Sequence, residues 1–285
     1  MKGRLTPYVL AFPAWFWLAI FLVVPIAAMA SVSTQTGNVI DGFVQTLSFS
    51  NYTDALGRYS NQLLRSLWYG GLATVVMIVI GYPVAYWIAF KGGNRKSMYL
   101  FLLLLPFFVS FVLRTISWGF LLADDGILLG TLKNWGLLPS GFHVLATTVA
   151  VVGGLTYNFL PFMILPIYVA LERVDPRVVE AAQDLYASKT AAFRRVVLPL
   201  SLPGVFAGVL MTFVPATADP VNSQILGGTE NTMIGNIIQT EYLVNNNYPT
   251  ASALSFTLMA VLLVGIFIYA RALGTENVLE AAATR

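Results

Sequence analysis

The stretch that decides the fold is Asp175–Gly204, DPRVVEAAQDLYASKTAAFRRVVLPLSLPG, a polar interval between two long apolar runs. Asp175 followed by Pro176 predicts a helix start, because the carboxylate accepts hydrogen bonds from free backbone N–H groups and proline fits the first helical position. Ser188 predicts a second helix start, of a short helix that runs through Phe193. The interval therefore predicts a helical hairpin and not a passive connector.

This hairpin is expected to present an apolar edge to water. Its members are Leu185, Tyr186 and Phe193, and the small side chains of Ala181 and Ala182 let another surface approach closely. Because an apolar edge on a water-exposed loop is unfavourable when it stands alone, the edge indicates a protein partner.

Outward from the hairpin, the chain has the composition of a membrane protein. Of its 285 residues, 57% are hydrophobic and 10% are charged, against about a quarter charged in a soluble domain. A transmembrane helix needs roughly 20 mainly apolar residues, and six such windows occur. They lie at about 8–31, 66–90, 97–123, 142–171, 200–218 and 250–270. We predict a single all-α domain of six transmembrane helices.

Two of the windows are irregular. Arg114 interrupts the third, and the fourth is long enough that we expect it to tilt or break near Pro161 and Pro166, which lack a backbone donor. The first window resembles a secretory leader, but the stretch from Leu5 to Ile40 has no charged residue. A leader core has about 7–15 apolar residues, so an uncleaved span is expected.

Charge decides the orientation. The termini and the loops after the second and fourth windows hold Lys2, Arg4, Lys91, Arg95, Lys96, Arg173, Arg177, Lys189, Arg194, Arg195, Arg271 and Arg285. The other loops hold Arg58, Arg65 and Lys133. Since basic residues stay on the cytoplasmic side, both termini and the loop 172–199 are predicted to be cytoplasmic.

The outer loops are acidic. They carry Asp41, Asp54, Asp124, Asp125, Asp219, Glu230 and Glu241. This bias suits a cationic solute, and it also arises passively when basic residues are kept inside; the sequence leaves both explanations open.

Several classes of function are excluded or disfavoured. With no cysteine and one histidine, the chain offers no usual metal site and no Ser/His/Asp set. It has no Gly-rich phosphate loop of the GxxxxGK[ST] type, so any ATP and Mg²⁺ must be held by another chain. Its basic residues are scattered between apolar runs, which argues against nucleic acid. An ATP-independent transporter would be expected to show coupling carboxylates within its spans or inverted repeats, and the sequence shows neither. A membrane-bound enzyme would be expected to show a cluster of titratable residues within the spans, and none is found.

The loop also carries a recognisable motif. Glu180-Ala181-Ala182, then position 186, then Val196, Leu198 and Pro199 resemble the EAA motif of ABC importer permeases, E-A-A, three residues, G, nine residues, I-x-L-P. The resemblance implies the type I importer fold and a loop, Glu180 to Pro199, whose coupling helices dock on an ATP-hydrolysing subunit. Tyr186 departs from the family, which has glycine there, so we expect the bend between the helices to differ or the partner's groove to fit an aromatic ring.

The rest of the chain resembles the permeases of the spermidine/putrescine group. The stretches that carry this are 12–14, 106–115, 157–162, 213–216, 226–228 and 233–239. The resemblance implies a bacterial inner-membrane protein that works with a dimer of ATP-binding subunits, a second permease that is a related but different chain, and an external solute-binding protein. It implies that the solute is a polyamine. Ferric iron, a sulfate-like anion or an amino-acid derivative remains an alternative solute.

Four residues are candidates for the translocation path. Asp219 follows the fifth window, and its carboxylate could pair with an ammonium group of the solute. The alternative is that Asp219 is an ordinary charge of the outer loop. Tyr157 and Asn158 offer a ring face and an amide, although Asn158 equally suits hydrogen bonding between helices. Arg114 would repel a cation, so we favour a structural role and a pairing with Asp124 or Asp125.

Overall fold

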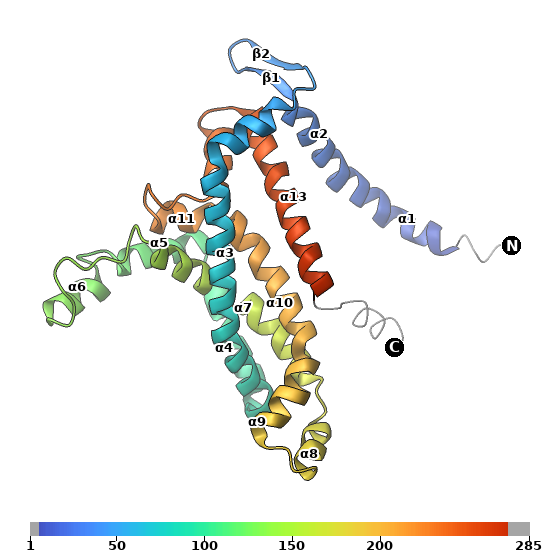
Figure 1. Cartoon of the computed structure of the whole chain (residues 1–285), viewed down its shortest axis with the longest axis vertical. Coiled ribbons are helices and arrows are strands. Elements are labelled where there is room, and N and C mark those ends of the chain that lie inside the picture. The colour runs from blue at the N-terminus through green and yellow to red at the C-terminus, as the bar shows by residue number, and fades with distance from the viewer. Residues whose placement is uncertain (1–5, 273–285) are drawn as a thin grey trace. The chain divides into compact units, whose positions relative to one another are not determined.

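The structure, a computed structural model, describes residues 6–272 (Figure 1). Its contacts divide the chain into two compact units. One unit comprises Met1–Asn61 and Ile237–Val261, and the other comprises Gln62–Asn236 and Leu262–Arg285. The helices α3 (Ser50–Lys91), α12 (Ile234–Leu243) and α13 (Tyr248–Ala272) contribute to both.

The first unit begins with one long apolar helical run. It consists of α1 (Thr6–Leu18), the π-turn η1 (Ala19–Val23) and α2 (Val24–Ser33), and it leads into the hairpin of β1 (Gln35–Asn38) and β2 (Gly42–Gln45). The two strands are antiparallel, with Gln35 opposite Gln45. They are the only strands among the described residues, so the all-α prediction holds.

The second unit holds the remaining helices. They are η2 (Gly93–Arg95), α4 (Lys96–Leu104), η3 (Leu105–Phe108), α5 (Phe111–Leu121), α6 (Ile127–Asn134), α7 (Thr148–Glu172), α8 (Pro176–Asp184), α9 (Lys189–Ala192), η4 (Phe193–Val197), α10 (Leu198–Ala218) and α11 (Val221–Leu226). In Figure 1, α7 and α10 run side by side, and α8 and α9 lie beyond one end of the pair.

Five helical runs in the described residues are long and apolar enough to cross a membrane. They are Ala11–Ser33, Ser50–Lys91, Thr148–Glu172, Lys189–Ala218 and Tyr248–Arg271. A sixth crossing requires the third window, which is not the single helix that we predicted. Gly93–Phe108 and Phe111–Leu121 meet at an angle of 86°.

The chemistry of the break accounts for this difference. Pro106 lacks the N–H group that would continue α4, so the chain tightens into the 3₁₀ turn η3. Val109 and Ser110 then take extended backbone angles, with ψ of 139° and 137°, before α5 begins. The third window is therefore a broken span or a re-entrant segment.

The fourth window differs in the opposite way. α7 is one continuous helix of 25 residues with Pro161 and Pro166 inside it, so the expected break does not occur. It starts at Thr148, because the Thr147 hydroxyl accepts a hydrogen bond from the Ala150 N–H and caps the helix.

The core of the second unit lies where α3, α7 and α10 meet. Met77, Leu155, Met163, Ile164 and Ile167 are almost fully buried there. Two glycines of α10 allow close approach to α7: a Cβ on Gly204 would lie 2.5 Å from the Ala170 Cβ, and one on Gly208 would lie 2.7 Å from the Met163 sulfur. Small residues at such positions are typical of helix pairs in membranes.

Candidate functional site

The hairpin between α7 and α10 forms as the sequence predicts at its first helix. The Asp175 carboxylate accepts a hydrogen bond from the Arg177 N–H at 2.9 Å, and Pro176 is the first helical residue. α8 then carries Glu180, Ala181 and Ala182, with Glu180 and Ala181 exposed. The predicted motif residues therefore share one short helix.

The end of α8 keeps its bend in spite of the bulky residue. Tyr186 has a φ of +62°. Its N–H donates to the Gln183 carbonyl at 2.9 Å, and the Ala187 N–H donates to the Ala182 carbonyl at 3.1 Å. This pair of bonds is the Schellman motif, in which glycine is the usual left-handed residue. Tyr186 thus takes a glycine conformation, so the first alternative, a different bend, does not occur. The second, a partner groove that fits an aromatic ring, stays a prediction.

The second helix is shorter than predicted, and it runs on into the span. The Ser188 hydroxyl caps α9 by accepting from the Ala191 N–H at 3.2 Å. α9 ends at Ala192, before Phe193, and the π-turn η4 leads directly into α10, which begins at Leu198 and Pro199. Lys189–Ala218 is consequently one helical run.

The apolar edge of the hairpin has two of the three predicted members. Tyr186 is 99% exposed and Leu185 is 82% exposed. Phe193 instead packs edge-on against Tyr82 and Tyr86 of α3, with ring centroids 5.8 and 5.6 Å apart. The prediction that Phe193 projects from the loop is wrong, because α3 supplies an aromatic surface that covers it.

Two of the four path candidates, Asn158 and Asp219, lie in a buried polar cluster that joins three helices. The Asn158 side-chain amide of α7 donates to the Thr115 hydroxyl of α5 and to the Asn222 side-chain oxygen of α11, each at 3.0 Å. All three residues are at most 1% exposed. Asn158 therefore forms hydrogen bonds between helices, which was one of the two interpretations of this residue. Its side-chain oxygen Oδ1, however, is buried with no hydrogen-bond partner in the described chain.

Asp219 completes this cluster from the end of α10. Its carboxylate accepts from the backbone N–H and the side-chain amide of Asn222, at 2.8 and 2.9 Å, and more weakly from the Val221 N–H. It lies just beyond the span Lys189–Ala218 and is only 6% exposed. Burial raises the pKa of the Asp219 carboxyl, and the hydrogen bonds lower it in part. The group fixes the start of α11, a role that the sequence analysis did not foresee.

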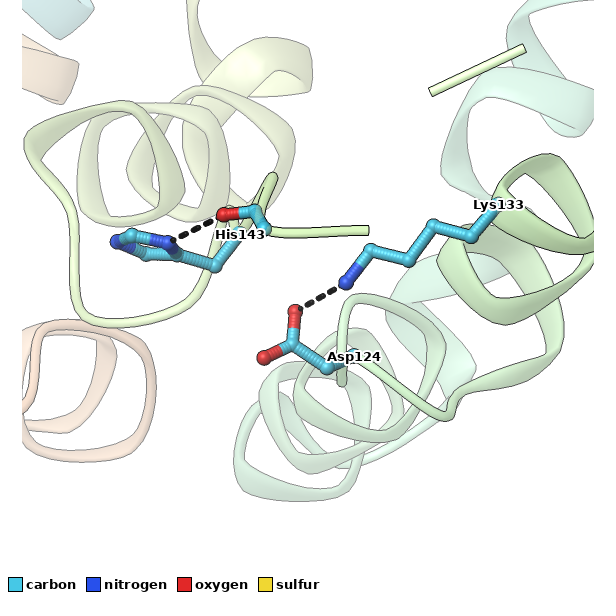
Figure 2. A network of polar contacts seen from close by, with 4 residues as sticks. Asp124, Lys133 and His143 are labelled. Carbon is cyan, nitrogen blue, oxygen red and sulfur yellow. Dashed lines mark hydrogen bonds and ion pairs between the residues drawn. The ribbon is translucent and has the colours of Figure 1, made fainter. Parts of the chain in front are cut away.

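Arg114 does not form the predicted ion pair. Asp124 pairs with Lys133 at 2.9 Å instead, as Figure 2 shows beside His143, and neither Asp124 nor Asp125 pairs with Arg114 in the described residues. The guanidinium carbon lies over aromatic rings, at 4.4 Å from the centroid of Phe107, 5.8 Å from Phe111 and 6.0 Å from Tyr157. Cation–π contacts thus stabilise this buried charge in part, while its Nε and Nη1 atoms are buried without a hydrogen-bond partner among the described residues.

Two members of the cluster were missed by sequence reasoning. Thr115 adjoins Arg114, and Asn222 lies three residues after Asp219 in a segment that looked like an ordinary outer loop. Asn222 follows Asp219 with the spacing of a capping contact, which is the one local signal that identifies it. In residues 6–272 no group of three His, Cys, Asp or Glu side chains is placed to hold a metal ion.

Comparison with known proteins places the chain in a family. It is 36% identical over 257 residues to the spermidine/putrescine transport system permease protein PotB of Haemophilus influenzae, covering 90% of both chains. It is 34% identical over the same length to PotB of Escherichia coli strain K12, covering 90% of this chain and 94% of PotB. The chain belongs to the spermidine/putrescine permease family.

More distant similarities agree with this permease family. The inner membrane ABC transporter permease protein YdcU of Escherichia coli is 32% identical over 76% of this chain. A crystal structure of a bacterial ABC transporter involved in the import of alginate has a chain that matches with a TM-score of 0.75 over 95% of this chain and 96% of its own. At 18% identity that match shows the fold alone. No family model matches the sequence.

Proposed function

We propose that this chain is one permease subunit of an ATP-driven importer that carries spermidine or putrescine across the bacterial inner membrane. The observation that carries the proposal is the 34–36% identity to PotB proteins over 90% of the chain. The subunit is not an enzyme by itself. ATP and Mg²⁺ are held by a dimer of ATP-binding subunits, and a second, related permease chain completes the membrane part.

The solute is delivered from outside by a binding protein. A solved alginate importer that matches this chain with a TM-score of 0.69 was crystallised with a periplasmic protein that holds the solute, which supports this kind of partner. Both termini and the hairpin are cytoplasmic in this proposal, as the basic residues indicate. ATP binding and hydrolysis beneath the two permeases then open the path alternately to either side.

The hairpin transmits this movement. Glu180, Ala181 and Ala182 of α8 meet the ATP-binding subunit, and Leu198 and Pro199 start the helix that continues into the span. Because Lys189–Ala218 is one helical run, a displacement of α9 is passed to α10 without an intervening loop.

The buried polar cluster lines the path on the outer side. Asn158 Oδ1 lacks a partner and accepts from an ammonium group of the solute once the site opens. Asp219 holds Asn222 in place and adds negative potential, and the Tyr157 ring offers a face to the cation. Arg114, stacked on Phe107, has a structural role.

Uptake by vesicles that contain the whole importer tests the solute. Labelled spermidine is taken up in the presence of ATP and the binding protein, with unlabelled spermidine, putrescine, ferric iron and sulfate as competitors. We expect only the polyamines to compete. Competition by iron or sulfate alone would assign another solute and leave the permease role intact.

The same vesicles test the energy source. Uptake is expected to stop when a catalytically inactive ATP-binding subunit replaces the active one, with the permease content unchanged. Transport by this chain reconstituted without any ATP-binding subunit would instead make it a secondary transporter.

A further inference from the structure

Tyr186 has a strained backbone and an exposed ring, and neither feature stabilises the permease on its own. Its backbone is held at a φ of +62°, where an L residue with a side chain is strained and glycine is not. Its side chain is 99% exposed and makes no ring contact in the described structure. Residues held in such sparsely populated backbone conformations cluster at functional sites.

A few residues further along the sequence, the hairpin also has a basic recess whose arginines lack an acidic partner among the described residues. An open recess of about 510 Å³ is lined by Ser188, Thr190, Ala191, Arg194 and Arg195. Both arginines are exposed, and neither forms an ion pair with a carboxylate in residues 6–272. Paired guanidinium groups with flanking hydroxyls suit a carboxylate, which arginine binds through two parallel hydrogen bonds.

The two features favour the same occupant. We propose that the hairpin contacts the ATP-binding subunit at two chemically different points. The Tyr186 ring enters an apolar pocket of that subunit, and the arginine recess binds one of its carboxylates. The inference rests on the proposed docking function and specifies the partner surface that this chain requires, an aromatic pocket and an acidic residue. Leu185 precedes Tyr186 in the sequence, is 82% exposed and enlarges the apolar contact.

Interface chemistry supports the pairing. An aromatic side chain buries about 150–250 Å² when it is fully covered, and Tyr and Arg are enriched among the few residues that carry most of the binding energy. The Schellman bonds fix the Tyr186 backbone before binding, so little further ordering of the chain is needed when the partner arrives. The result is an exposed aromatic side chain on a fixed backbone, a few residues before a basic recess.

Binding of the importer's own ATP-binding subunit to the permease pair in nanodiscs tests the ring. We expect Tyr186→Ala to raise the half-saturating concentration about tenfold or more, and Tyr186→Phe to leave it close to wild type. Tyr186→Gly is the decisive variant, because it removes the side chain while glycine adopts the same φ without strain. Binding of Tyr186→Gly as tight as wild type would overturn the aromatic half of the proposal.

The arginine half has its own variant and control. Arg194→Glu with Arg195→Glu is expected to weaken binding about tenfold or more in nanodiscs of neutral lipid, whereas Lys91→Glu, on the same side but outside the hairpin, leaves it unchanged. An effect seen only with anionic lipid would mean that the arginines contact lipid headgroups, and that outcome contradicts the carboxylate contact.

A third variant separates this inference from the docking role itself. Ala182→Asp places a charge in the motif helix and is expected to abolish binding. If Ala182→Asp abolishes binding while the Tyr186 and arginine variants bind normally, docking stands and the two-point contact is wrong. If Ala182→Asp also binds normally, the docking role is wrong.

Discussion

Tyr186 gives a measurable prediction in the permease alone. Left-handed backbone costs an L residue roughly 1–2 kcal/mol, and the freer unfolded chain of glycine offsets part of the relief. We expect Tyr186→Gly to slow amide hydrogen exchange at residues 182–187 about fivefold, which corresponds to about 1 kcal/mol. Leu185→Gly is the matched control, since Leu185 has a φ of −83°, and it should speed exchange. Faster exchange in Tyr186→Gly would show that the ring supports the hairpin.

Asp219 provides a second prediction for a single side chain. Its carboxylate oxygens accept the N–H groups that start α11, so Asp219→Ala should lower stability by about 1 kcal/mol or more. Asp219→Asn retains one acceptor and should fold, but the loss of negative charge should raise the KM for spermidine several-fold. Thermal unfolding and vesicle uptake provide the two measurements. A wild-type KM in Asp219→Asn would confine Asp219 to the capping role.

At the scale of the element, the close packing of α10 against α7 can be tested. A Cβ on Gly204 would lie 2.5 Å from both the Ala170 Cβ and the Pro166 carbonyl oxygen. Overpacking of this kind costs about 1–3 kcal/mol, so Gly204→Ala should lower the thermal midpoint of the purified permease and its coupled transport. Gly153→Ala is the control, because no atom lies within 4 Å of its Cβ position. Equal midpoints in the two variants would contradict the packing.

Glu180 and Ala182 of α8 give the prediction for the hairpin. Both lie on a helix that the structure leaves exposed or half-buried, so substitution there should not disturb the spans. We expect Glu180→Ala to lower solute-stimulated ATP hydrolysis in the assembled importer while the thermal midpoint of the permease stays unchanged. Full stimulation in Glu180→Ala would remove Glu180 from the coupling surface.

Sequence reasoning succeeded where local chemistry decides the element. The caps at Asp175 and Ser188 formed as predicted, because each needs only its own side chain and the N–H groups two or three residues on. It failed where packing decides. Phe193 is covered by Tyr82 and Tyr86 of a helix about a hundred residues earlier, and no local signal reports that contact.

The break expected near Pro161 and Pro166 is absent, and the bend after Pro106 was not predicted, for a related reason. Pro161 and Pro166 remain inside a continuous α7, whereas the chain bends by 86° after Pro106. A proline removes one donor in either case, and the surroundings determine whether the helix tolerates the loss. α7 is buried along much of its length by neighbouring helices, while none of the side chains of α4 and η3 is buried.

At the scale of the whole molecule, the distribution of basic residues predicts the orientation in the membrane without reference to any partner. The sequence contains no cysteine, so each introduced cysteine is the single thiol of its variant. Ile40 is 94% exposed in the turn between β1 and β2, Leu185 is 82% exposed at the end of α8, and Lys91 is exposed at the end of α3. These positions sample the predicted outer side once and the predicted cytoplasmic side twice.

Labelling of intact cells with a membrane-impermeant maleimide then decides the topology. Ile40→Cys should react in intact cells, whereas Lys91→Cys and Leu185→Cys should react only after the membrane is permeabilised, because the basic loops stay inside. The unmodified chain gives the background, and uptake activity of each variant shows that it is folded. Reaction of Leu185→Cys in intact cells would place the hairpin outside, where it meets no ATP-binding subunit, and the coupling mechanism would fail with it.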